Sequence, residues 1–323
     1  MSANVESMAY ANAKPWHGLG TPVDESITPE EMVEKAGLNW AVATAPLKYD
    51  VPMGFRVRTR EAPKQRALYR TDTGDLLDVV GHEWNPVQNT EVLEFFREYV
   101  EAGDATLETA GSLDDGRMVW ALAKLRASFT LDGDDRVEGY VLLANPHQYR
   151  KALTVKVTNI RVVCWNTITA ALRGAGREVR LSHRKPFTES VRQEAKRNLG
   201  IAREKVDAFA GVADRLSRLT LDQEDAAKLA GEILGVEDPL ESLERPRGSY
   251  NLRHVLDLYN GDGAGSRLPS AQDTGWGLLN AVTEWQDHYQ GHNQNNRLKT
   301  SWFGRGETLK RRAMDHLLEV APK

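Results

Sequence analysis

The residues best suited to chemistry are the cations in the middle of the chain. Between Asn145 and Lys205 there are 14 lysines and arginines but only four glutamates, a local excess of ten positive charges. The whole chain carries a formal net charge of −4, so the rest of it is acidic by 14 charges. Because the local field rather than the net charge attracts a polyanion, this basic sector indicates a nucleic-acid partner.

Aromatic and amide side chains are interleaved with these cations. Trp165 could stack on a base, and Asn166 could hydrogen-bond to one. Cationic grooves with aromatic platforms hold single strands without sequence preference. The plain alternative is a solvated helix face whose cations pair with their own glutamates. The nucleic-acid contacts that we expect are Lys156, Arg161, Trp165, Asn166, Arg184, Lys185, Arg192, Lys196, Arg197, Lys310 and Arg311.

The last two of these contacts belong to a second basic segment, near the end of the chain. Glycines at 304 and 306 stand beside a predicted helix start, and Lys310, Arg311 and Arg312 follow. A glycine-rich turn at a helix N-terminus can hold a phosphate. The segment lacks the Gly-Lys-Ser/Thr of a nucleotide-binding P-loop. It is either a second phosphate contact or a capped helix with a solvated basic face.

Trp16 and His17 are possible ligand contacts of another kind. Gly18 and Gly20 would let backbone N–H groups approach a phosphate or carboxylate, and Trp16 offers a stacking face. This is not a dinucleotide fingerprint, because the third glycine is missing. The alternative is a structural plug that holds the N-terminal segment against the rest of the molecule.

No remaining group of residues makes a complete active site. His288 and His292 have the i,i+4 spacing of metal ligands, but Gly291 interrupts the helix between them. The acidic run 132–135 is most simply a turn. Cys164 is the single cysteine and has no neighbouring base to activate it. We therefore expect no metal, no cofactor and no catalytic residue.

The elements that position these residues divide the chain into a strand-rich part and a helical part. Strand patterns with turn residues between them dominate from Trp40 to Val163, interrupted by a helix that Asn89 or Thr90 caps and that ends near Val100. Thr28 and Glu31 form a capping box for an earlier helix, whereas the first 25 residues are too rich in glycine and proline for regular structure. A short helix follows Asn166.

After Pro186 the pattern changes from strands to helices. Amphipathic helices are expected at 188–219, 222–234, 251–259, 274–290 and 306–320, with a flexible loop or linker at 261–270. The fold class is therefore α+β: an antiparallel β-meander sheet with packed helices, followed by a mainly helical C-terminal region. We place the domain boundary between residues 1–185 and 186–323.

Four segments carry a resemblance to a known family: PWHGLGTPV (15–23), TNIRVVCWNTITAAL (158–172), TGWGLLNAVTEWQDH (274–288) and SWFGRGETLKRRAMDHL (301–317). In their order and spacing they resemble the phage/plasmid-like protein family, a group of unknown function found in prophages, phages and plasmids. The resemblance implies a mobile genetic element in a bacterial host cell. It brings no activity and no catalytic residues.

Composition supports the same cellular setting. No run of about 18 apolar residues could span a membrane, and the first residues lack the basic and apolar regions of a secretory signal. One cysteine cannot form an internal disulfide, which suits a reducing compartment. We expect a cytoplasmic protein.

The leading hypothesis is a nucleic-acid-binding protein of a mobile element that binds or anneals single-stranded DNA in phage or plasmid recombination or replication. Self-association is expected, because single-strand binders are commonly cooperative. The alternative is an interaction protein that inhibits a host defence or regulatory factor through the acidic remainder of the chain. A hydrolase that uses the His17 region is the third reading.

Overall fold

The computed structural model describes residues 5–12, 19–161, 166–168, 178–184, 186–199, 202–245, 248–290 and 305–322. The chain forms two compact units. Unit 1 comprises Met1–Lys124, Val141–Lys156 and Glu178–Gly200, and unit 2 comprises Leu125–Tyr140, Val157–Arg177 and Ile201–Lys323. The division between these units is not the expected boundary at residue 185. Strands β7 (Met118–Leu131), β8 (Asp135–Pro146) and β9 (Leu153–Arg161) each contribute residues to both units.

Eight strands form the larger sheet, in the order β10-β9-β8-β7-β6-β1-β2, with β11 also paired to β9. The remaining strands of this sheet are β1 (Val5–Ala11), β2 (Thr21–Val23), β6 (Ala105–Leu113), β10 (Asn166–Ile168) and β11 (Glu178–Leu181). β1 pairs antiparallel to β6, and both β10 and β11 pair antiparallel to β9. With the helical C-terminal region, this confirms the expected α+β fold class.

Two expectations for local structure are wrong in this sheet. The first 25 residues contain β1 and β2, which pair in parallel, with Ala9 opposite Thr21. Asn166 lies in a strand rather than at a helix start. For β1, hydrogen bonds to β6, a strand distant in sequence, override the local preference, whereas β10 pairs with β9, the strand that precedes it in the chain.

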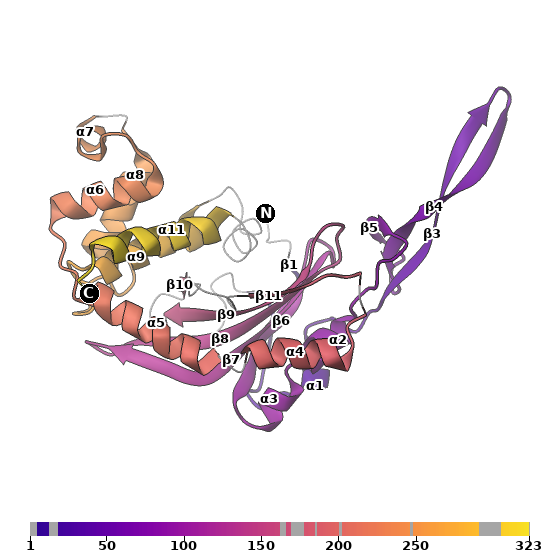
Figure 1. The fold of residues 1–323 in the computed structure, drawn as a ribbon, viewed down its shortest axis with the longest axis horizontal. Helices are drawn as coiled ribbons and strands as arrows, with labels where there is room; N and C mark the ends of the chain where they lie inside the picture. Colours follow the sequence, from indigo (N-terminus) through magenta and orange to yellow (C-terminus); the bar gives the residue numbers. More distant parts are fainter. Residues whose placement is uncertain are drawn as a thin grey trace. The chain divides into compact units, whose positions relative to one another are not determined.

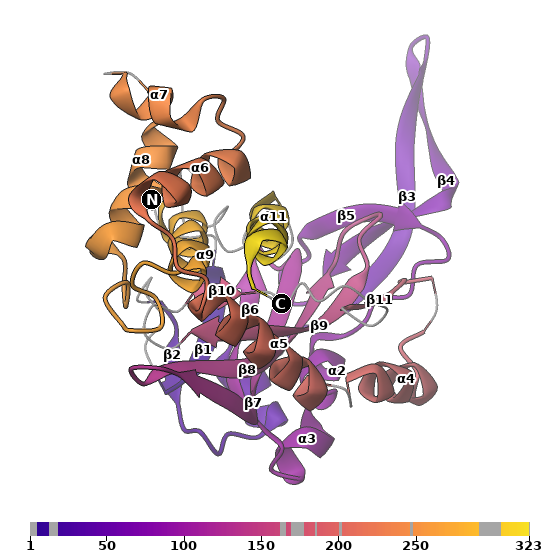
Figure 2. The same ribbon diagram turned by 60° about the vertical axis from the view of Figure 1, so that its left-hand side comes forward.

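A second sheet has the order β3-β4-β5, with strands Val42–Met53, Arg56–Arg70 and Leu76–Gly81. β5 pairs only with Gln65–Tyr69 of β4, whereas β3 and β4 remain paired out to Met53 and Arg56. Beyond β5 the two long strands therefore continue as a two-stranded ribbon, which projects past β5 in both views (Figures 1 and 2). We call residues 48–61 of this ribbon the arm.

Four helices belong to unit 1: α1 (Pro29–Lys35), α2 (Asn89–Glu94), α3 (Arg97–Glu101) and α4 (Glu189–Leu199). The capping box of Thr28 and Glu31 begins α1, as expected. The cap of α2 is Gln88 instead of Asn89 or Thr90. The Asn89 side chain is buried and donates to the carbonyl oxygens of Leu38 (3.3 Å) and Trp40 (3.0 Å), so it forms hydrogen bonds within the core instead of capping the helix.

Unit 2 contains most of the helical region. Its helices are α5 (Ala202–Ser217), α6 (Gln223–Leu234), α7 (Pro239–Glu244), α8 (Tyr250–Asp257), α9 (Gly275–Glu284) and α11 (Arg305–Val320), with π-helical turns η1 (Leu258–Asp262) and η2 (Trp285–Tyr289). Helices α6, α8, α9 and α11 match the expected positions. The single helix expected at 188–219 is instead two helices, α4 and α5, which belong to different units.

A buried carboxylate joins the sheet strand β8 to helix α9 within unit 2. Asp135 is fully buried and accepts hydrogen bonds from Ser270 Oγ (2.7 Å) and Trp276 Nε1 (2.9 Å). Ala264 N–H also donates to the Glu284 carboxylate. Residues 261–270 are therefore a packed loop inside unit 2, not the flexible linker that their composition suggested.

Candidate nucleic-acid interface

Several of the expected contacts lie outside the described residues or side chains. Trp16, His17, Trp165 and Lys185 are outside the described part of the chain. Arg161, Asn166 and Lys196 have their backbones in β9, β10 and α4, and their side chains are not described. Cys164 and His292 are also outside it. The expectations for these residues stay predictions.

Two expected contacts are wrong because their side chains are buried. Lys156 in β9 is 1% exposed, and Lys310 in α11 is 2% exposed. The Lys310 ammonium donates to Asp287 Oδ1 at 2.9 Å, and Asp287 is itself buried. A buried ammonium cannot reach a phosphate backbone on the surface. Lys310 is therefore not a phosphate contact, whereas the expectation for the exposed Arg311 of the same segment stays a prediction.

The other described members of the expected set are accessible to different degrees. Arg192 is partly buried and pairs with Glu189 at 3.0 Å, as the solvated-helix reading expects. Arg184, Arg197 and Arg311 are exposed. Of these, Arg184 lines a pocket of unit 1.

The arm carries a cationic face that sequence reasoning missed. Arg56, Arg58 and Arg60 are alternate residues of β4, so their side chains lie on one face of the ribbon. All three are exposed, and within the described part of the chain none of them forms an ion pair. Their partners across the ribbon are Met53, Val51 and Tyr49, none of them acidic. We call these six residues the arginine face.

The opposite face of the arm is acidic by one charge. Its cross-strand pairs are Lys48 with Glu61, Asp50 with Thr59, and Pro52 with Val57. The Thr59 hydroxyl donates to Asp50 Oδ1 at 2.7 Å. The two faces of one ribbon therefore differ by four charges, since one carries three cations and the other one cation and two carboxylates.

The tip of the arm is apolar. Gly54 and Phe55 form the two-residue loop between the paired residues Met53 and Arg56, and Gly54 has a φ of +61°, as the first position of a type II′ hairpin turn requires. Phe55 is completely exposed, at 109% of its reference area, and Met53 is 55% exposed. Large apolar side chains presented to solvent in this way mark a contact surface.

The sequence does contain the signal for this face. Phe55-Arg-Val-Arg-Thr-Arg60 alternates arginine with other residues, the two-residue period of a strand. The net charge of a long window obscures this alternation. The register with β3, which puts Asp50 and Glu61 on the other face, is not readable from the pattern.

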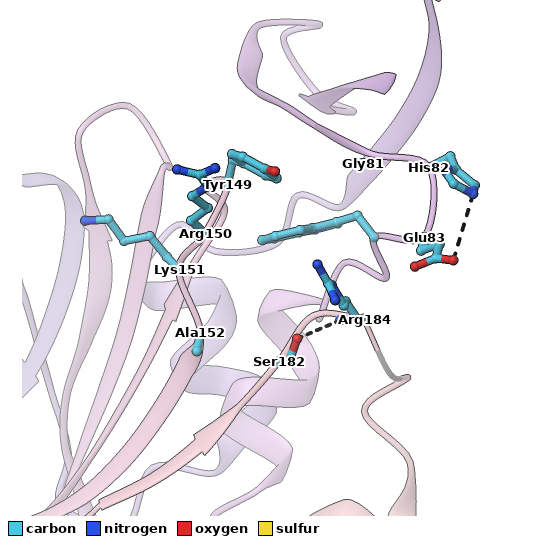
Figure 3. Close-up of a pocket in the computed structure, with 10 residues that line it drawn as sticks. Gly81, His82, Glu83, Tyr149, Arg150, Lys151, Ala152, Ser182 and Arg184 are labelled. Carbon is cyan, nitrogen blue, oxygen red and sulfur yellow. Dashed lines mark hydrogen bonds and ion pairs between the residues drawn. The ribbon is translucent and has the colours of Figure 1, made fainter. Parts of the chain in front are cut away.

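A pocket in unit 1 is lined by three further cations, Arg150, Lys151 and Arg184 (Figure 3). Its volume is about 520 Å³, within the range of small-molecule sites. Tyr149 and Arg150 approach it from one loop and Arg184 from another (Figure 3). The lining residues are Gly81, His82, Glu83, Trp84, Tyr149, Arg150, Lys151, Ala152, Ser182 and Arg184. We call it the Trp84 pocket.

Two buried histidines lie close to the residues of this pocket. The ring of His183 stacks on that of Trp84, with centroids 4.3 Å apart and planes inclined by 16°. Burial lowers the pKa of His183 to about 4. Burial, with a smaller contribution from His183, lowers the pKa of His147 to about 3. Both imidazoles are therefore neutral at pH 7, and His147 Nε2 lies 3.2 Å from Asn89 Oδ1.

No group of three or more histidine, cysteine, aspartate or glutamate side chains in the described ranges could hold a metal ion. Nor is any helix among the described residues long and apolar enough to cross a bilayer.

Comparison with known proteins places the chain in a family. The family model described as a domain of unknown function, DUF932, matches residues 76–308. The match includes every residue of the Trp84 pocket and excludes the arm. No curated protein and no solved structure matches the chain. The chain belongs to the DUF932 family.

Proposed function

We propose that this protein binds nucleic acid through the arginine face of the arm. The observation that carries the proposal is the separation of charge on the arm. Arg56, Arg58 and Arg60 stand on one side, without carboxylates, and both acidic residues stand on the other. Three adjacent unpaired guanidinium groups suit a run of phosphates, because arginine binds phosphate oxygens in a bidentate manner.

The shape of the arm suits a duplex. The major groove of B-DNA admits a two-stranded β-ribbon, and several DNA-binding proteins place such a ribbon in a groove. An exposed Phe55 beside Met53 at the tip resembles the apolar wedges that architectural proteins insert between base pairs. These features favour duplex DNA over the single strand that the basic sector suggested. The single-strand preference stays a prediction that the same experiment tests.

Fluorescence anisotropy with one labelled sequence, as a duplex and as a single strand, tests the proposal at about 50 to 200 mM salt. The test variant is Arg56→Gln/Arg58→Gln/Arg60→Gln. If three phosphate contacts are lost, the plot of log affinity against log salt becomes shallower by about 2.7 for a duplex or about 2 for a single strand. Affinity at the lowest salt should fall at least tenfold.

The matched control removes three cations of unit 2 that are already paired. Arg218, Lys228 and Arg245 are exposed and bind carboxylates four residues away, at Asp214, Glu224 and Glu241. Arg218→Gln/Lys228→Gln/Arg245→Gln changes the net charge equally and should leave the salt slope unchanged. Equal losses in the two triple variants would mean that net charge, and not the arm, attracts the nucleic acid.

The biological setting is part of the proposal and rests on the sequence resemblance. Motif order similar to that of phage and plasmid proteins points to recombination, replication or protection of a mobile element. The alternative of a protein partner makes a different prediction. A pull-down from nuclease-treated host lysate would then retain a partner that the arm variant also binds.

A further inference from the structure

We infer that the Trp84 pocket binds a nucleoside 5′-phosphate, either free or as the phosphorylated end of a strand. The inference is independent of the proposed function, because the pocket and the arm share no residue. It rests on three properties of the pocket: its charge, its aromatic surface and the way its walls are held.

The charge of the lining suits a phosphate. Arg150, Lys151 and Arg184 line the pocket against a single carboxylate, Glu83. Within the described residues none of the three cations forms an ion pair, whereas Glu83 lies 4.0 Å from His82. Arg150 and Arg184 lie on different walls of the pocket, and Lys151 extends away from Arg184 (Figure 3).

The aromatic surface suits a base. His183 covers one face of Trp84, so a ligand ring would stack on the other face. Tyr149 is 51% exposed at the pocket, and the guanidinium carbon of Arg150 lies 5.3 Å from the centre of its ring. Aromatic side chains beside arginines are how proteins hold unpaired bases. A phosphate alone would engage the cations but not the aromatic rings.

Hydrogen bonds from Asn85 hold two of the walls together. Asn85 Nδ2 donates to the carbonyl oxygens of Glu83 (3.0 Å) and Arg184 (3.1 Å), and Asn85 N–H donates to the His183 carbonyl oxygen (2.6 Å). These bonds tie the segment that carries Trp84 to the segment that carries Arg184.

The wall that carries Tyr149 is held separately. Tyr149 N–H donates to Asp78 Oδ2 at 2.7 Å, which ties this loop to β5. Arg150 has a φ of +60°, a conformation that is costly for a residue with a side chain. Strained residues of this kind cluster at ligand sites, because the surrounding structure must hold them in place. The pocket is therefore preformed rather than assembled by the ligand.

Isothermal titration of the intact chain with AMP, adenosine and inorganic phosphate tests the inference. AMP should bind more tightly than either of its parts, because it engages both the cations and the rings. Arg184→Gln should weaken AMP at least tenfold, as expected for loss of a charge-assisted hydrogen bond. The matched control is Arg218→Gln, an exposed cation of unit 2 outside the pocket, which should leave AMP binding unchanged.

Oligonucleotides distinguish the two sources of the ligand. In the triple arm variant, a 5′-phosphorylated oligonucleotide that binds more tightly than its 5′-hydroxyl form identifies a strand end, and binding of AMP alone identifies a free nucleotide. Either result supports the inference. Absence of AMP and 5′-phosphate binding at millimolar concentration, or equal effects of Arg184→Gln and Arg218→Gln, would overturn it. AMP binding that survives the arm variant separates this result from the proposed function.

Discussion

The arm and helix α11 are both basic in sequence, but their cations are placed in opposite ways. On the arm, Arg56, Arg58 and Arg60 are exposed, and the nearby carboxylates lie on the other face. In α11, Lys310 is buried on Asp287, and Arg312 donates to the carbonyl oxygen of Glu232 at 2.7 Å. The first arrangement leaves positive charge available to a ligand, whereas the second uses it within unit 2.

The comparison teaches that a count of basic residues does not define a cationic surface. The sector between Asn145 and Lys205 has an excess of ten charges, yet Lys156 is buried and Arg192 is paired. The arm has a smaller excess, and its strand register concentrates it on one side.

Removing the buried cation of α11 should cost the most stability. Lys310→Met leaves the Asp287 carboxylate without its ammonium partner in the interior, which typically lowers the free energy of unfolding by about 3–5 kcal/mol. Urea denaturation measures it. Arg311→Met, at the exposed neighbouring position, should change the same quantity by less than about 0.5 kcal/mol. Similar values for both variants would contradict the buried pair.

Acid should destabilise the molecule through its buried histidines. The folded pKa values of about 3 for His147 and about 4 for His183 lie below the ordinary value of 6.5. The unfolded chain therefore binds more protons, and stability present above pH 6.5 is lost as the pH falls toward 4. Between pH 7 and 5 the loss should be about 2 kcal/mol for each histidine.

His183→Phe provides the corresponding test, because phenylalanine can retain the stack on Trp84 but cannot be protonated. Its stability should fall less between pH 7 and pH 5 than that of the native chain, measured by urea denaturation at each pH. His82→Gln, at an exposed position, is the control and should leave the pH dependence unchanged. An unaltered pH dependence in His183→Phe would rule out His183 as a source of the acid effect.

The smallest predicted effect distinguishes the two faces of the arm. Arg58→Gln and Lys48→Gln each remove one positive charge, from the arginine face and from the opposite face. Arg58→Gln should lower duplex affinity about fivefold and make the salt slope shallower by about 0.9. Lys48→Gln should change both much less, because Lys48 lies on the face that also carries Asp50 and Glu61. Equal effects in anisotropy titrations would show that the faces do not differ in function.

Elements that depend only on neighbouring residues follow from local sequence. The capping box of Thr28 and Glu31 begins α1, and Asp222 caps α6, because capping hydrogen bonds span only a few residues. The turn at 114–116 joins β6 and β7 as its Asp-Asp-Gly sequence predicts, with positive φ at all three residues. The α+β class follows from the same local periodicities.

Which residues are accessible to a ligand depends on tertiary contacts. The pairing of β1 with β2, the burial of Lys156 and Lys310, and the convergence of three segments on the Trp84 pocket all join residues far apart in the chain. The arginine face likewise depends on the register of β3 with β4, because a shift of one residue would bring the carboxylates beside the arginines. Residue type determines what chemistry a side chain can do, but partners from distant segments determine whether that chemistry faces solvent.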